Sequence, residues 1–202
     1  MNEHVRPQSL TRGPETTQAA EGLPRRKWTV EELRKIIEAG IIDEDENFEL
    51  LGGEVVPMSP KGRRHEVLRA GLNMHWGRAR PDTIKFGAEA PIELSKHDWP
   101  EPDFFFHPAE IALMEATGET VLLVVEVSDS SLYKDRKLKA RIYATFGIRE
   151  YWVIDAKTLM TRVHMLPSAE GYGSVADIPP AEMLVPKLAP AMAVRIADLD
   201  LG

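Results

Sequence analysis

The most informative part of the sequence is VLLVVEVSDSSLYKDRKLKARIYATFGIREYWVID, which runs from Val121 to Asp155. It begins with an apolar run that contains a glutamate, passes through a short polar turn into a charged amphipathic segment, and ends in a second apolar run. The first run is continuous rather than alternating, which predicts a central strand covered on both faces. A carboxylate inside such a strand, with lysines and arginines just beyond it, is typical of a functional site.

The amphipathic part, residues 129–147, predicts a helix. Polar residues can cap its start, and Gly147 suits its end. Residues 149–155 then return as a strand, and residues 159–165 are expected to pair with it in antiparallel fashion. The cap residues are Asp129, Ser130 and Ser131, and the predicted buried stripe is Leu138, Ile142, Tyr143 and Phe146.

The rest of the sequence predicts the elements that surround this stretch. Residues 1–24 show no hydrophobic period and are expected to form a disordered tail, so that residues 25–202 make a single domain. A capping box at Thr29 and Glu32 predicts a short helix that stops at Gly40, and Gly52-Gly53 predicts a hairpin turn. A long helix is expected over residues 64–80, an edge strand over residues 91–94, and short edge elements after residue 170.

Composition excludes several classes of function. The chain has 202 residues, a formal net charge of -7 and no cysteine, so thiol catalysis, zinc-thiolate sites and disulfide frameworks are ruled out. The charge argues against a surface that is basic all over, although basic clusters occur at residues 25–27, 61–64 and 134–141. No apolar segment is long enough to span a bilayer, and the N-terminus has no secretory pattern, so we expect a cytoplasmic protein without membrane contact.

Two carboxylates are candidate metal ligands. Glu126 lies near the end of the predicted central strand, and Asp103 lies at the start of a strand that follows Pro100 and Pro102. Because neighbouring strands are about 4.8 Å apart, two such carboxylates could hold one hard divalent cation. A buried glutamate needs a partner, but an arginine or lysine could also fill that role. The spacing does not decide between a metal ion and a structural ion pair.

The charged helix allows a similar pair of interpretations. Asp135 and Lys139 are four residues apart and share a helix face, so they could form a surface ion pair that contributes about 0.3–0.5 kcal/mol. Alternatively, Lys139 could lie over a metal and orient the attacking water. The chemistry does not choose among Lys134, Lys137 and Lys139 for that role.

The order of several motifs resembles the bacterial Uma-two family, a restriction-endonuclease-like branch of the PD-(D/E)XK nuclease superfamily. The motifs are EPD at 101–103, VVEVS at 124–128, DRKLK at 135–139 and GIREYWVID at 147–155. The hairpin motif FEL at 48–50, GEV at 53–55, MSP at 58–60 and His65 at the start of the long helix agree with it. The match begins at about Trp28 and extends to the C-terminus.

The resemblance implies an α/β (α+β) fold with a restriction-endonuclease-like core, in which helices flank a mixed sheet of about four strands. An N-terminal hairpin and C-terminal edge strands would be additions to that core. It also implies Mg²⁺, with Mn²⁺ as a substitute, bound by Asp103, Glu126 and the main-chain carbonyl of Val127. Ser128 stands where many superfamily members have lysine, and Lys139 is the matching position on the helix. Glu49, His65 and Asp135 would be accessory residues.

The function expected from the resemblance is metal-dependent endonuclease activity that hydrolyses phosphodiester bonds, with DNA rather than RNA as the substrate. The alternative is a catalytically inactive nuclease-fold module that binds nucleic acid or a protein partner. A third class is a purely structural domain in which Glu126 belongs to an ion pair. Related nucleases that cut two strands with two subunits suggest, by analogy, a homodimer.

Overall fold

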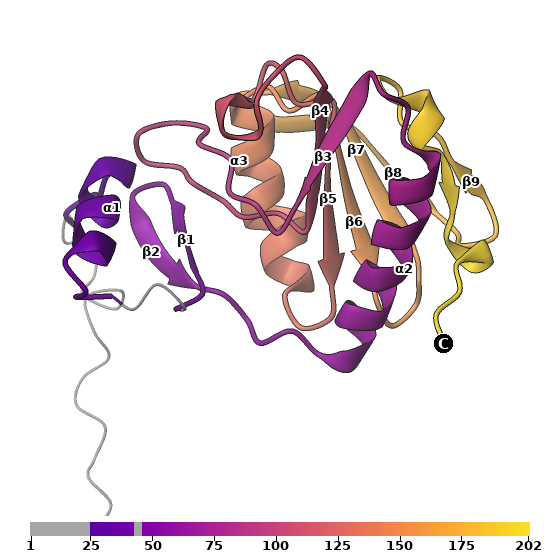
Figure 1. Cartoon of the computed structure of the whole chain (residues 1–202), viewed down its shortest axis with the longest axis horizontal. Coiled ribbons are helices and arrows are strands. Elements are labelled where there is room, and N and C mark those ends of the chain that lie inside the picture. The colour runs from indigo at the N-terminus through magenta and orange to yellow at the C-terminus, as the bar shows by residue number, and fades with distance from the viewer. Residues whose placement is uncertain (1–24, 43–45) are drawn as a thin grey trace, which may run out of the picture.

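The computed structural model describes residues 25–42 and 46–202, and its centre is a six-stranded mixed sheet (Figure 1). The strand order in the sheet is β3-β4-β5-β6-β7-β8. The tail predicted over residues 1–24 lies outside the described residues, and the single domain over residues 25–202 stays a prediction. The strands are β3 (Ile84–Ala88), β4 (Phe104–Pro108), β5 (Leu123–Ser128), β6 (Glu150–Asp155), β7 (Thr161–Ser168) and β8 (Gly171–Ile178).

Strand β5 occupies the interior of the sheet, as its continuous apolar run predicts. It pairs antiparallel with β4 and parallel with β6, and all six of its residues are buried. Strand β7 pairs antiparallel with β6, which confirms the predicted return of the chain. The sheet has six strands, more than the four or so implied for the core alone. Strand β3 pairs with β4 at one edge, and β8 at the other edge is a full strand of eight residues on β7 rather than a short element.

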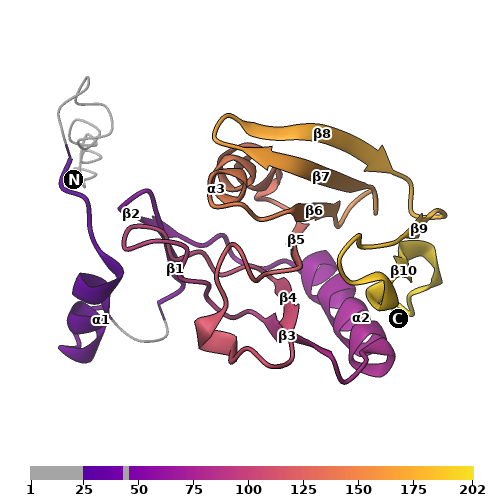
Figure 2. The ribbon, with the colours of Figure 1, turned by 90° about the horizontal axis from the view of Figure 1, so that it is seen from above.

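Two helices cover opposite faces of the sheet. Helix α2 (Arg63–Ala79) packs against one face through Leu68, Leu72 and Trp76, which share a core with Phe104 and Phe106 of β4. Helix α3 (Ala140–Thr145) packs against the other face, and its core includes Phe105, Val124 and Tyr151. Successive residues of a strand point to opposite faces, so the run of three phenylalanines serves both cores. Figure 2 shows α2 and α3 on the two sides of the sheet.

The helix after β5 differs from the prediction in its register. It contains a six-residue π-helix, η2 (Lys134–Lys139), which leads directly into α3. Leu138, predicted to be buried, is 44 % exposed, whereas Lys139 is buried. The prediction was wrong at this position because the inward side of the helix is occupied by a charged side chain that has carboxylate partners, described below.

The N-terminal elements form a small unit beside the sheet (Figure 1). Helix α1 (Val30–Glu38) begins with the predicted capping box, in which Thr29 and Glu32 exchange side-chain and backbone hydrogen bonds. Strands β1 (Phe48–Leu51) and β2 (Glu54–Pro57) form the predicted hairpin around two glycines with positive φ. Leu50 also bridges to Trp99, which ties the hairpin to the segment that leads into β4.

Residues 91–94 form no strand, which corrects the predicted edge strand. Ile92 is buried in the α3-side core, so its apolar character reflects packing rather than strand pairing. The connection before β5 contains a short 3₁₀ turn, η1 (Leu113–Glu115).

After β8 the chain crosses to α2, where Trp76 donates a hydrogen bond to the carbonyl of Met192 (2.9 Å). Within the described ranges, the structure contains no helix with the length and apolar character that a bilayer span requires. The elements of this C-terminal segment are β9 (Met183–Leu184), η3 (Pro190–Met192), β10 (Val194–Arg195) and η4 (Ile196–Asp198).

Candidate active site

Asp103 and Glu126 lie at the same end of the sheet. Phe104 of β4 pairs with Val125 of β5, so the antiparallel register carries Asp103 to the level of Glu126. The backbone N–H of Val127 donates to Oδ2 of Asp103 at 2.7 Å, which fixes one oxygen of that carboxylate. Both carboxylates are buried, at 6 % and 4 % exposure. The structure therefore brings together the two acids that the sequence singled out.

Glu126 has two hydrogen-bond donors, and both come from the helix after β5. Lys139 donates from Nζ to Oε1 of Glu126 at 2.8 Å, and the hydroxyl of Tyr143 donates to the same oxygen at 3.1 Å. The structure thus contains an ion pair between Glu126 and Lys139, which is one of the two interpretations given for a buried glutamate. Among the described residues no donor reaches the second oxygen, Oε2, so this atom is open to another ligand.

The structure distinguishes the three lysines of the helix. Lys139 is buried, and its ammonium lies between Oε1 of Glu126 and Oε1 of Glu49, the latter at 2.7 Å. Lys134 contacts the other oxygen of Glu49 at 3.1 Å and is partly exposed. Lys137 is exposed, and within the described part of the chain it forms no ion pair. Of the three, only Lys139 contacts Glu126.

Asp135 does not form the surface ion pair with Lys139 that one interpretation predicted. Its side chain is 2 % exposed, and its Oδ2 accepts hydrogen bonds from the hydroxyls of Ser128 and Ser131, each at 2.5 Å. The pairing fails because Lys139 points toward Glu49 and Glu126 instead. Asp135 thus joins the end of β5, through Ser128, to the start of the helix, through Ser131.

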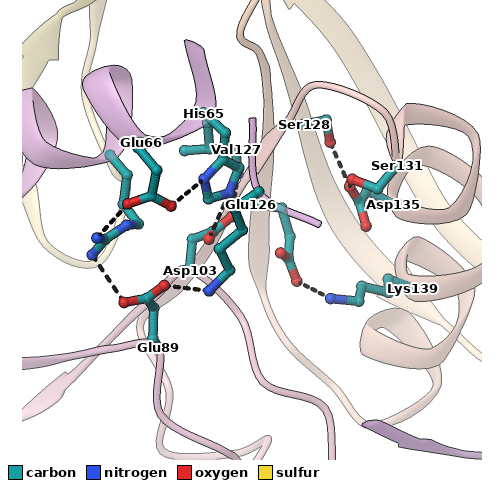
Figure 3. A network of polar contacts seen from close by, with 12 residues as sticks. His65, Glu66, Glu89, Asp103, Glu126, Val127, Ser128, Ser131, Asp135 and Lys139 are labelled. Carbon is teal, nitrogen blue, oxygen red and sulfur yellow. Dashed lines mark hydrogen bonds and ion pairs between the residues drawn. The ribbon is translucent and has the colours of Figure 1, made fainter. Parts of the chain in front are cut away.

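His65 contacts the other candidate ligand. Its Nε2 lies 2.9 Å from Oδ1 of Asp103, and its Nδ1 lies 3.1 Å from Glu66. Arg69, one turn further along α2, pairs with Glu66 at 2.8 Å and with Glu89 at 3.0 Å. Figure 3 shows this chain of contacts on one side of the site and the Lys139 and Asp135 contacts on the other. Asp103 is therefore held by α2 as well as by β5.

The buried site contains more carboxylates than ammonium groups, and this imbalance shifts the pKa values of its residues. Burial raises the pKa of Glu126 well above its usual range, and the neighbouring acids Asp135, Asp103 and Glu49 add to this effect, whereas Lys139 opposes it. Burial disfavours the charge on Lys139, but Glu126 and Glu49 outweigh it and raise the pKa of its ammonium. A cation near Glu126 would favour its ionised form.

The pKa values of two accessory residues, Glu49 and His65, are shifted in opposite directions. Burial opposes ionisation of Glu49, yet the ammonium groups of Lys139 and Lys134 lower its pKa below the usual value. Burial also opposes the charge on His65, but its hydrogen bond to Asp103 and the charges of Asp103 and Glu66 raise its pKa. Both residues are thus stabilised in their charged forms.

The pocket is lined by oxygen atoms of the kind that a magnesium ion prefers as ligands. A pocket of about 40 Å³ opens between the end of β5, the start of α2 and the π-helix, and its lining includes Asp103, Glu126 and Val127. This volume is enough for about two or three water-sized groups. Mg²⁺ is commonly bound by one or two carboxylates and keeps several waters, and Oε2 of Glu126 has no donor in the described chain. No cluster of three or more His, Cys, Asp or Glu side chains suited to a metal occurs among the described residues.

Three side chains of the site, those of Tyr143, Arg69 and Glu66, are not predicted as functional from the sequence. Tyr143 was assigned to the buried stripe, although its hydroxyl also reaches Glu126. Its spacing of four residues from Lys139 was the available signal, because residues four apart share a helix face. Arg69 and Glu66 were not singled out, since a charged helix face ordinarily reflects solvent exposure.

Comparison with known families identifies a family for this chain. The family model Uma2, described as "Putative restriction endonuclease", matches residues 30–197. The chain belongs to the Uma2 family. This confirms the resemblance drawn from the sequence motifs, and the matched region runs from α1 to η4, so that it contains every residue of the candidate site.

A solved structure resembles this Uma2 chain in fold. It is a crystal structure of "a putative nuclease belonging to DUF820" from Anabaena variabilis, with a TM-score of 0.60 and 17 % sequence identity. The alignment covers 84 % of this chain and 96 % of that one. A search of the curated proteins gave no match. The fold of the Uma2 chain is therefore that of a nuclease-like protein, a mixed sheet flanked by helices.

Proposed function

We propose that this protein is a Mg²⁺-dependent endonuclease that hydrolyses phosphodiester bonds of nucleic acid, with DNA as its substrate. The observation that carries the proposal is the convergence of Asp103, Glu126 and Lys139 on one small pocket. Membership of a family described as restriction endonucleases supports it, as does the nuclease-like fold. A pair of acids with a buried lysine is the minimum set for metal-assisted phosphodiester hydrolysis.

Asp103, Glu126 and the main-chain carbonyl of Val127 would hold the metal ion. Mn²⁺ would be a substitute, because it also accepts oxygen ligands. When bound, the ion would supply Lewis-acid stabilisation of charge on the phosphate and a more acidic water. The chain contributes buried surroundings, since both carboxylates are largely shielded from solvent.

The remaining roles belong to side chains already positioned in the site. Lys139 would hold the attacking water and stabilise charge that develops on the phosphate, since its ammonium is buried and lines the pocket. Tyr143 supports Glu126 from the same helix, and His65 orients Asp103 from α2. The carboxylates are thus held by hydrogen bonds before a ligand arrives.

The test compares neutral, nearly isosteric variants of the two acids with a matched control. Asp103→Asn and Glu126→Gln should abolish Mg²⁺-dependent cleavage of plasmid and single-stranded DNA, while circular dichroism reports a folded protein. Glu150→Gln is the control, because Glu150 is also a buried glutamate but lies at the opposite end of the neighbouring strand β6, bonded to Trp152 and Lys187. It should retain cleavage. Cleavage that survives in both acid variants would refute the proposal.

A second candidate is an inactive nuclease-fold module that binds nucleic acid or a protein partner. The buried Glu126–Lys139 ion pair favours it, because the site holds a positive charge without a metal. Calorimetric titration with Mn²⁺ separates the two candidates, since only the nuclease requires binding that depends on Asp103 and Glu126. The predicted homodimer is a separate proposal, which sedimentation analysis of the full chain tests.

A further inference from the structure

Glu49 is a buried carboxylate that enters the site from outside the central sheet. It belongs to β1 of the N-terminal hairpin, and its side chain is fully buried. Its Oε1 accepts from Lys139 at 2.7 Å and from the backbone N–H of Glu101 at 3.0 Å, and its Oε2 accepts from Lys134 at 3.1 Å. One carboxylate therefore binds two lysines of the same helix.

The π-helix makes this double contact possible. Lys134 and Lys139 are five residues apart, which in an α-helix would turn their side chains about 140° away from each other. In a π-helix the hydrogen bonds join residues five apart, so these positions lie nearly one above the other. The N–H of Ala140 bonds to the carbonyl of Asp135, which is this spacing. The π-helix thus directs both ammonium groups toward Glu49.

The consequence concerns how Lys139 divides its charge between two acids. Its ammonium lies 2.7 Å from Glu49 and 2.8 Å from Glu126, so neither carboxylate has exclusive use of it. If the charge on Glu49 were removed, Glu126 would be the remaining acid in contact with Lys139 among the described residues. The ammonium would then neutralise Glu126 more completely and compete with any cation that binds there.

We propose that Glu49 is a positioning residue, which holds Lys139 away from exclusive pairing with Glu126 and so keeps Glu126 available to a divalent cation. This inference rests on the proposed function, because it assigns Glu126 to the metal. It adds a role for the hairpin, which lies outside the six-stranded sheet: the hairpin sets the position of the lysine of the site.

The direct test is the affinity for Mn²⁺, measured by calorimetry on the full chain without DNA. Glu49→Gln should weaken Mn²⁺ binding about tenfold. In this variant the ammonium of Lys139 would bind Glu126 more strongly, by about the free energy of one charge-assisted hydrogen bond, and Mn²⁺ would have to overcome that gain. A free energy of this size corresponds to a factor of about ten or more in affinity. Lys134→Met should bind Mn²⁺ at least as tightly as the wild type, since it leaves Glu49 to Lys139 alone. Lys137→Met, an exposed lysine of the same helix, should bind as the wild type does.

Two further variants separate positioning from a general loss of negative charge. Glu101→Gln removes a carboxylate that lines the pocket and forms no ion pair among the described residues, so it should weaken Mn²⁺ binding much less than Glu49→Gln does. In a chain that already carries Lys139→Met, Glu49→Gln should have no further effect on Mn²⁺ affinity, because the competing ammonium is gone. A purely structural or electrostatic role for Glu49 would leave its effect intact in that background.

The outcomes distinguish this inference from the proposed function. If the wild type neither binds Mn²⁺ nor cleaves DNA, the proposed function fails. If the wild type does both, and Glu49→Gln binds Mn²⁺ equally well or acts the same with and without Lys139→Met, only the role of Glu49 is overturned. Should Glu49→Gln not fold, Glu49→Asp replaces it: the shorter side chain cannot reach both lysines, and several-fold weaker binding is expected.

Discussion

Replacing Lys139 by methionine tests how the buried charges of the site support the fold. The substitution keeps the length of the side chain but leaves Glu126 and Glu49, both buried, without the ammonium that they share. Breaking a buried ion pair costs about 3–5 kcal/mol, because an uncompensated charge remains. Glu49 retains Lys134 at 3.1 Å, so the loss falls mainly on Glu126. We therefore expect the low end, a loss of about 3 kcal/mol in the free energy of unfolding.

The assay is urea denaturation at neutral pH in the presence of EDTA, followed by tryptophan fluorescence, because Trp76 and Trp152 are buried. Lys137→Met is the matched control and should change stability by less than about 0.5 kcal/mol, as surface substitutions usually do. Combining Lys139→Met with Glu126→Gln removes the stranded charge, and the amide oxygen can still accept from Tyr143. The double variant should recover about 2 kcal/mol of the loss, since removing both partners of a pair costs far less than removing one.

Two results would refute this reasoning. A Lys139→Met protein as stable as Lys137→Met would mean that the pair contributes nothing to the fold. A double variant no more stable than Lys139→Met alone would mean that the cost comes from lost packing rather than from a stranded carboxylate.

Two other predictions concern residues away from the site. Burial lowers the pKa of His164 to about 4, so the unfolded chain takes up a proton first as pH falls through 6.5. The contribution of His164 to stability should be full above that pH and should decline by about 3 kcal/mol toward pH 4. His164→Phe, which keeps an aromatic ring in the same stack, should show a smaller decline in urea titrations at several pH values, and an identical decline would contradict the assignment. A Cβ at Gly118 would lie 2.0 Å from the carbonyl oxygen of Phe146, so Gly118→Ala should lower the midpoint of thermal unfolding. Gly77→Ala on helix α2, where the added methyl meets open space, should raise that midpoint, and equal shifts in the two variants would count against the steric argument.

Much of the architecture could be predicted from local patterns. Three elements are each indicated by a pattern only a few residues long, and all three are confirmed. They are the helix with the capping box at Thr29, the hairpin with its glycine pair, and strand β5 with its apolar run. Predictions that depended on distant partners were less accurate. The apolar residues at 91–94 look like a strand, but Ile92 packs in a core formed by residues far along the chain.

The site shows the same division. The positions of Asp103 and Glu126, each at a recognisable place on a strand, indicated that two acids would meet, and the structure brings them together. The choice among three lysines could not be made from helix periodicity, because the π-helix changes the register and an α-helical stripe predicts Leu138 rather than Lys139 on the inside.

Most of the strand and helix order, the family and the two acids can be predicted from the sequence, because they depend on short-range patterns and on motif order. The contacts of Lys139 with Glu126 and Glu49, of Asp135 with two serines and of His65 with Asp103 arise only in the folded chain. Each of these contacts joins elements distant in sequence, or depends on a helix register that no local pattern specifies. An unpaired charge is costly when it is buried, so each buried charge of the site is paired. Its partner is the oppositely charged group that the fold places within contact distance.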